Sequence, residues 1–99
     1  MWVRLARSSD IDGIVGIDAE AGGDAYRRAL ILQGIAEDGC WIAGRDEAPE
    51  GYLVLSRRHF YGRDFVSLVE VRERARRGGL ASALFQAAET GATTPQVFT

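Results

Sequence analysis

The stretch that decides the fold runs from Phe65 to Glu89 and reads FVSLVEVRERARRGGLASALFQAAE. Its first seven residues are nearly all apolar, which predicts a central strand covered on both faces. A basic turn containing two adjacent glycines follows the strand. The turn leads into a helix with the clearest helical period in the chain, carried by Leu80, Ala83, Leu84, Ala87 and Ala88. A short strand after this helix would pair parallel to the first one through a right-handed crossover.

The turn holds four arginines within six residues, followed by Gly78 and Gly79. Like charges at this density repel one another, and two glycines are a poor start for a helix. A helix N-terminus attracts anions, and glycine allows a ligand to approach the main chain closely. Arg76 and Arg77 would add charge-assisted hydrogen bonds to phosphate oxygens. The pattern therefore predicts a phosphate site, and the alternative is a solvated charge run beside a glycine-rich turn.

Two other phosphate motifs do not fit the chain. A P-loop requires a lysine after its second glycine, and the chain contains no lysine. A dinucleotide-binding fold requires G-x-G-x-x-G after the first strand, and that pattern is absent there.

The remaining segments complete a β-α-α-β-β-β-α-β order, which predicts one α/β (α+β) domain over residues 1–99 with a mixed sheet. The segments are a strand over 2–7, a helix after Ser8–Asp10 ending near Gly22–Gly23, a helix over 24–37, strands over 40–44 and 51–56, a turn region over 59–64 and a short strand over 96–99. We expect the first helix to bury Ile11, Ile14 and Val15, and the second to bury the face of Ala25, Ala29, Leu32 and Ala36, flanked by Ile31 and Ile35.

Composition excludes several classes of protein. A net charge of −2 argues against a general nucleic-acid binder, although residues 51–99, with seven arginines against four acids, are the anion-attracting half. No apolar run approaches the roughly 18 residues of a membrane helix, so we expect a cytoplasmic protein. Cys40 is the only cysteine, which excludes an internal disulfide, and its place in an apolar run predicts a small buried side chain.

The turn Arg76-Arg77-Gly78-Gly79-Leu80-Ala81 resembles the acetyl-CoA-binding motif of the GNAT superfamily of N-acetyltransferases, commonly written [Q/R]-x-x-G-x-[G/A]. The order of elements resembles that family over essentially all of the chain. The resemblance implies transfer of an acetyl group from acetyl-CoA to a primary amine of a small molecule or peptide. It implies that the stretch from Arg76 to Ser82 wraps the pyrophosphate of CoA. It also implies that main-chain groups of Val69, Glu70 and Val71 hold the pantetheine arm and polarise the thioester.

Glu70 is the candidate general base, because it is the charged residue in an apolar strand and partial burial would favour its protonated form. The alternative is that its carboxylate points to solvent or pairs with a nearby arginine. His59, the only histidine, falls in a predicted hairpin turn and is expected to be idle. Tyr26 would line an acceptor pocket or, as we expect, belong to the core. No pattern of metal ligands is present.

The chain departs from the family pattern in two ways. Glu73 and Ala75 stand where the family often has a proline and an aromatic residue. The further helix and strands that usually follow the fifth strand, and often supply a tyrosine acid, are missing. We therefore expect the 99 residues to pair with a second copy as a homodimer or to be part of a longer chain. The runner-up function is a non-catalytic acetyl-CoA-binding regulatory or interaction module of the same fold.

Overall fold

The computed structural model describes residues 1–18, 23–60, 63–91 and 97–98, which form one five-stranded sheet with helices on both faces. The strands, in both chain and spatial order, are β1 (Trp2–Leu5), β2 (Cys40–Gly44), β3 (Gly51–Phe60), β4 (Arg63–Val71) and β5 (Val97–Phe98). The first four strands are antiparallel, whereas β5 pairs parallel to β4 at Asp64 and Phe65. The predicted mixed sheet and its parallel last strand are confirmed.

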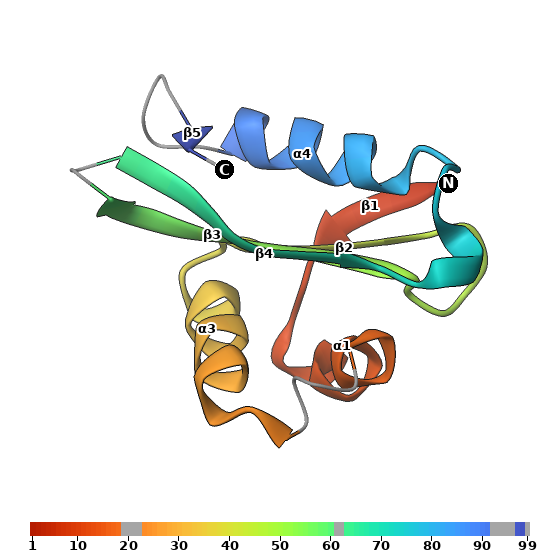
Figure 1. Ribbon diagram of the computed structural model, residues 1–99, viewed down its shortest axis with the longest axis horizontal. Coiled ribbons are helices and arrows are strands. Elements are labelled where there is room, and N and C mark those ends of the chain that lie inside the picture. The colour runs from red at the N-terminus through yellow and green to blue at the C-terminus, as the bar shows by residue number, and fades with distance from the viewer. Residues whose placement is uncertain (19–22, 61–62, 92–96, 99) are drawn as a thin grey trace.

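The helices divide between the two faces of the sheet. They are the short 3₁₀ turn η1 (Ser8–Asp10), α1 (Ile11–Ile17), α3 (Ala25–Ala36), a second 3₁₀ turn η2 (Glu73–Ala75) and α4 (Leu80–Gly91). Helix α4 covers one face, and α1 and α3 cover the other (Figure 1). The described helices follow the predicted order, and none is long and apolar enough to cross a membrane.

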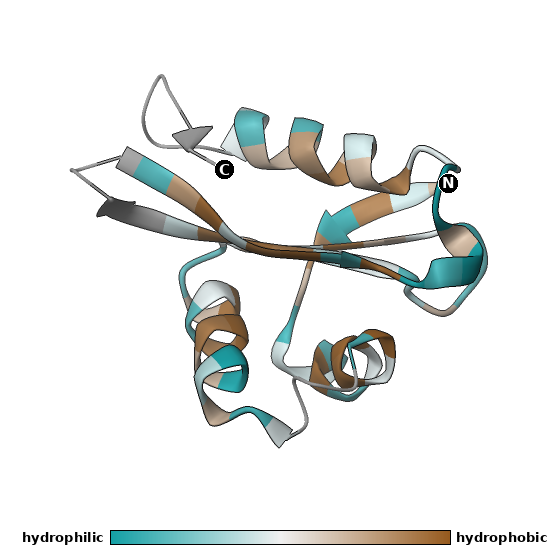
Figure 2. Ribbon diagram, viewed as in Figure 1, coloured by the Kyte–Doolittle hydropathy of each residue, from teal (hydrophilic) through white to brown (hydrophobic). Residues whose placement is uncertain are grey.

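Alternation along β3 separates two hydrophobic clusters, one on each face of the sheet. Leu53 and Leu55 belong to the cluster beneath α4, whereas Tyr52 and Val54 belong to the cluster against α1 and α3. The α4 cluster contains Leu80, Leu84 and Ala88, the period predicted for that helix. Figure 2 shows the hydrophobic centre of the sheet beside a hydrophilic turn between β4 and α4. The fold therefore places the basic turn at the rim of the core.

β4 is not the central strand that its apolar sequence predicts. Instead, β2 and the first half of β3 are buried on both faces of the sheet. In β4, Val69 is 38% exposed, and among the described residues β5 pairs only with Asp64 and Phe65. In the described part of the chain the second half of β4 is consequently a sheet edge, where Val69 is exposed although Val71 is buried in the α4 cluster.

Helix α3 is one residue shorter at each end than predicted, and the prediction of its buried face is wrong. Asp24 caps its first turn by accepting hydrogen bonds from the amides of Tyr26 and Arg27. The buried residues are Ile31 and Gly34, whereas Leu32 on the predicted face is 47% exposed. The isoleucines that were expected at the flanks decide the packing, because they bury more apolar area than alanines do.

Other local predictions divide between right and wrong. Helix α1 ends at Ile17 and not near Gly22–Gly23, of which Gly22 lies outside the described residues. His59 belongs to β3, which continues to Phe60 through the segment predicted as a turn. Tyr26 is 69% exposed and is not a core residue.

Cys40 is fully buried, and this burial raises the pKa of its thiol to about 12, so the thiol stays neutral and inert.

Candidate functional site

The turn between β4 and α4 is the first part of the candidate site. Beyond β4 the chain makes η2, whose Ala75 is buried, and then enters α4 through Arg77, Gly78 and Gly79. Arg77 has a φ of 67° and Gly79 a φ of 87°, whereas Gly78 between them lies outside the positive region. Successive residues of opposite φ are typical of nests, in which neighbouring backbone N–H groups form a concavity of the kind that binds anions.

The start of α4 adds further donors to this concavity. The first bond into the helix runs from the amide of Ala83 to the carbonyl of Gly79 at 3.0 Å. The preceding amides, on Leu80, Ala81 and Ser82, have no acceptor within the helix. Leu80 is buried in the core, which fixes the start of the helix, whereas the next two residues, Ala81 and Ser82, are exposed. The turn therefore presents several fixed N–H groups at the positive end of a helix dipole.

The arginines of the turn differ in what they bind. Arg76 is directed back to β4, where Nε donates to the Val71 carbonyl at 3.1 Å and Nη2 to Glu70 at 3.2 Å. Arg74 lies 3.4 Å from a carboxylate oxygen of Glu50. The described contacts include no acidic partner for Arg77, which is exposed. Arg77 is accordingly the member of the predicted phosphate pair whose charge is available in this structure.

The second part of the site is the open edge of β4. The amide of Arg72 donates to the Glu50 carbonyl at 2.8 Å, on the β3 side. Alternation along a strand then turns the backbone groups of Glu70 toward β3 and those of Val69 and Val71 toward the opposite edge. Of the three predicted main-chain positions, Val69 and Val71 thus present their amides to the open edge, and Glu70 does not.

The side chain of Glu70 lies on the other face of the sheet from α4. It stands opposite Tyr52 in the β3–β4 register, on the side of α1 and α3. Its ion pair with Arg76 matches the alternative interpretation of this residue, in which the carboxylate pairs with an arginine. The carboxylate is about one third exposed, at 36%, and so remains accessible to a ligand.

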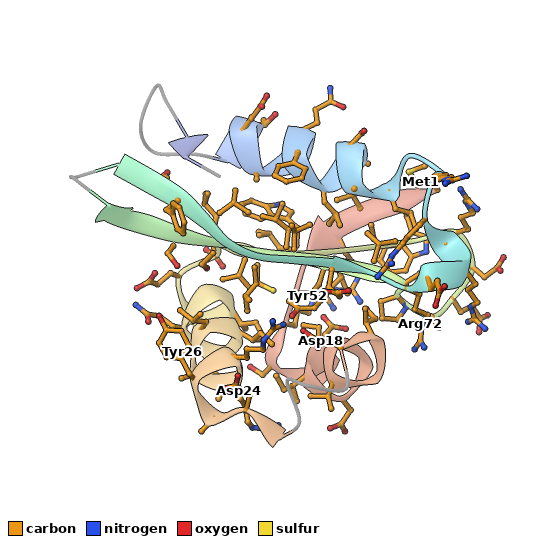
Figure 3. All side chains as sticks on the ribbon, in the orientation of Figure 1. Met1, Asp18, Asp24, Tyr26, Tyr52 and Arg72 are labelled. Carbon is orange, nitrogen blue, oxygen red and sulfur yellow. The ribbon has the colours of Figure 1, made fainter. Side chains whose placement is uncertain are left out.

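A buried polar network next to Glu70 was missed by sequence reasoning. The Tyr52 hydroxyl donates to Asp18 at 2.7 Å, and Arg27 donates to the same carboxylate oxygen at 2.7 Å. Figure 3 shows Tyr52 and Asp18 in the layer between the sheet and α1. Burial and the neighbouring carboxylate raise the pKa of Tyr52, so its hydroxyl keeps its proton. No local spacing predicts this network, because its members come from three separate parts of the chain.

Two further features bear on what the site can bind. The described residues contain no cluster of three metal-ligating side chains. A cavity of about 620 Å³ lies between β1, β2 and the later part of α4, and no residue of the basic turn lines it. The turn and the open β4 edge are therefore separate from that cavity.

Known proteins share this arrangement of elements. The sequence model described as the acetyltransferase (GNAT) family matches residues 12–96. A GNAT-family acetyltransferase structure from Bacillus cereus has 32% identity and a TM-score of 0.84, over 97% of this chain and 67% of that one. No curated protein sequence matched the chain.

Two more distant structures share the fold. A GNAT-like decarboxylase in complex with isobutyryl-CoA has 22% identity and a TM-score of 0.73, over 96% of this chain and 61% of that one. A diaminobutyrate acetyltransferase from Paenibacillus lautus was solved in complex with 2,4-diaminobutyric acid and coenzyme A. It has 20% identity and a TM-score of 0.71, over 89% of this chain and 55% of that one. The chain thus spans between about half and two thirds of the length of these three structures.

Proposed function

The chain belongs to the GNAT acetyltransferase family, and on that premise we propose that it binds acetyl-CoA and moves the acetyl group to a primary amine. The observation that carries the proposal is the alternation of φ at Arg77, Gly78 and Gly79 directly before α4. This backbone provides an N–H concavity of the kind that holds a diphosphate.

The diphosphate of CoA binds at this turn in our proposal. The amides from Gly79 to Ser82 donate to the phosphate oxygens, and Arg77 adds a charge-assisted hydrogen bond. Arg76 joins them only if it exchanges its bonds to Glu70 and Val71 for bonds to phosphate. The proposal thus retains the whole predicted stretch from Arg76 to Ser82, with different tasks for its two arginines.

The thioester lies along the open edge of β4. The outward amides of Val69 and Val71 are the donors available there, and a carbonyl oxygen that gains negative charge is stabilised by such fixed N–H groups. The two more distant structures described above were solved with coenzyme A or an acyl-CoA, which supports CoA or an acyl-CoA as the ligand.

Glu70 receives the proton of the amine. A lysine-type amine has a pKa of about 10.4 and must lose a proton before it attacks the thioester carbon. Glu70 takes this first proton. The neutral amine then attacks, so that a C–N bond forms and the C–S bond breaks. The second N–H proton is released to solvent, and CoA leaves as a thiolate that is protonated by solvent. The acceptor is a small-molecule or peptide amine. The exposed fraction of Glu70 supports this role, because an acceptor reaches the carboxylate from the α1–α3 side.

The experiment has two stages. CoA should raise the melting temperature of the parent, because a ligand specific for the folded state stabilises it. The double variant Arg76→Ala/Gly79→Asp should lose this stabilisation, since its second substitution introduces a negative charge and a Cβ where φ is 87°. Arg28→Ala on the exposed side of α3 is the matched loss of one positive charge and should behave as the parent.

The second stage measures release of thiol from acetyl-CoA with a panel of amines. Turnover with any amine supports the transferase. Stabilisation by CoA without turnover would instead indicate a non-catalytic CoA-binding module, which the Glu70–Arg76 ion pair favours because it occupies the candidate base. If the double variant binds CoA as tightly as the parent, the turn is not the phosphate site.

A further inference from the structure

An arginine outside the basic turn donates a hydrogen bond to the main chain of the turn. Nη2 of Arg45 donates to the carbonyl of Gly78 at 2.8 Å, although the two residues are 33 positions apart. Arg45 directly follows the buried strand β2, so the base of its side chain is held by the sheet. Met1 approaches the neighbouring position, with its terminal methyl 3.5 Å from where a Cβ on Gly79 would lie. Figure 3 shows Met1 beside the start of α4.

The contact determines which way the Gly78–Gly79 peptide faces. The peptide is trans, so the carbonyl of Gly78 and the amide of Gly79 point in opposite directions. Because Arg45 holds the carbonyl, the amide of Gly79 points to the side of the turn opposite Arg45. A cationic donor on this carbonyl makes a stronger hydrogen bond than a neutral donor does.

The same contact explains the glycine at position 78, whose φ does not itself require one. A Cβ built on Gly78 would overlap the guanidinium of Arg45. Any other residue at this position requires the flexible end of the Arg45 side chain to shift. Arg45 and Gly78 thus act as one unit, whereas Gly79 is required for its positive φ.

We propose that Arg45 is a positioning residue for the diphosphate site, which it serves by fixing the peptide that aims the Gly79 amide at the anion. The proposal rests on the proposed function, since it concerns the same turn. Arg45 acts on the ligand through the backbone and does not touch it. The described contact of the Arg45 guanidinium is with this carbonyl, and no described ion pair joins it to a carboxylate.

The experiment is a double-mutant cycle on Arg45 and Gly78, read out as the CoA dissociation constant. Arg45→Ala should raise the constant about tenfold, the equivalent of one hydrogen bond to a charged group. Gly78→Ala should raise it by a similar factor. The double variant Arg45→Ala/Gly78→Ala should be no worse than either single variant, because both remove one contact.

Two further variants separate positioning from charge and from folding. Arg45→Lys keeps the charge and one donor and should recover part of the affinity. Arg28→Ala, which removes a charge far from the turn, should leave it unchanged. The amide resonance of Gly79 should move on addition of inorganic diphosphate in the parent and much less in Arg45→Ala. This readout would not change if Arg45 only stabilised the fold.

The outcomes separate this proposal from the function on which it rests. If the parent does not bind CoA, the proposed function fails. If the parent binds CoA and Arg45→Ala binds it equally well, Arg45 is not a positioning residue. Additive losses in the cycle would overturn it too, because they would mean that Gly78 acts independently of Arg45. Should Arg45→Ala fail to fold, Arg45→Lys and Gly78→Ala still complete the test.

Discussion

At the scale of single residues, Arg77 carries a conformational cost at the candidate site. Its φ of 67° lies in the left-handed region, which costs a residue with a Cβ roughly 1–2 kcal/mol. Such strain persists where the surrounding structure determines the backbone and is common at ligand sites. Here the buried Ala75 on one side and the buried Leu80 on the other hold the turn.

Two replacements of Arg77 should therefore distinguish the effect of its backbone strain on stability from the effect of its charge on CoA binding. Arg77→Gly should raise the free energy of unfolding by about 0.5–1 kcal/mol, because glycine adopts a positive φ freely but adds entropy to the unfolded chain. Arg77→Ala keeps the strain and should not stabilise the protein. Both variants should weaken CoA binding alike if Arg77 supplies a charge. Chemical denaturation and calorimetric titration of the two variants measure this, and equal stabilities would show that the turn relaxes around Arg77.

Glu70 is the second residue whose role is directly testable. Glu70→Gln should lower kcat and remove the decline of the rate at low pH without weakening CoA binding, since its side chain lies on the face away from α4. The variant also frees Arg76, so Arg76→Gln is the matched control for loss of the ion pair. A pH–rate profile of the parent's shape in Glu70→Gln would remove this residue from the mechanism.

At the scale of elements, the sequence predicts those segments whose pattern agrees with their packing. The period of α4 is carried by large and small apolar residues on one face, and Leu84 is accordingly buried. In α3 the alanines are regular but small, so the burial of Ile31 decides the orientation of the helix. In β4 the apolar run indicates low polarity but not which strand lies beside it, and Val69 is exposed at an edge.

The candidate site, too, can be predicted from the sequence only in part. The turn was predicted because its charge, glycines and helix start are contiguous in the sequence. The contacts of Arg45 with Gly78 and of Tyr52 with Asp18 join residues more than 30 positions apart, at 33 and 34. Such contacts follow from the register of the sheet and from no local spacing, so they appear only once the fold is known.

The link between β1 and η1 gives a pH-dependent prediction at this scale. Arg4 donates to both carboxylate oxygens of Asp10, at 2.8 and 2.9 Å, and the amide of Arg7 donates at 2.7 Å. The hydrogen bonds from Arg4, and secondarily that from the Arg7 amide, lower the pKa of Asp10. A lowered folded-state pKa stabilises the protein above the unfolded value, about 3.9, and this stabilisation is lost as the pH falls through the folded-state value.

Asp10→Asn should thus cost about 0.5–1 kcal/mol at pH 7, a modest value because Arg4 is partly exposed. The difference between the variant and the parent should shrink below pH 4. Urea denaturation at pH 7, 5 and 3 measures it. Glu89→Gln, an exposed acid late in α4, is the control for the loss of a charge. A difference that stays constant down to pH 3 would show that the Arg4–Asp10 pair does not stabilise the junction.

At the scale of the whole molecule, the sheet separates two sides that meet at the second half of β4. The basic turn and the start of α4 lie at one end of this edge, and the side chain of Glu70 lies on the α1–α3 side. The backbone of Val69 and Val71 faces the edge itself. A donor that enters from the turn and an acceptor that enters from the α1–α3 side would meet there.

This arrangement predicts where CoA should protect the backbone from hydrogen exchange. CoA at a free concentration of 100 times its dissociation constant stabilises the whole fold by about 2.7 kcal/mol. It therefore slows the exchange of all amides that exchange through global unfolding. Amides that exchange through local opening respond only where the ligand touches them. We expect additional protection at Val69 and Val71 on the open edge and at Gly79 in the turn. Glu70 is the internal control, because its amide already faces β3.

Exchange followed residue by residue with and without CoA measures this pattern. Uniform slowing of Glu70 and its two neighbours would mean that the ligand stabilises β4 as a whole and does not pair with its edge. Protection confined to the turn would leave the diphosphate site in place but would move the thioester away from Val69 and Val71. Because the three residues are consecutive in one strand, they differ mainly in the direction that their amides face. The contrast between them therefore reports the path of the ligand along the sheet.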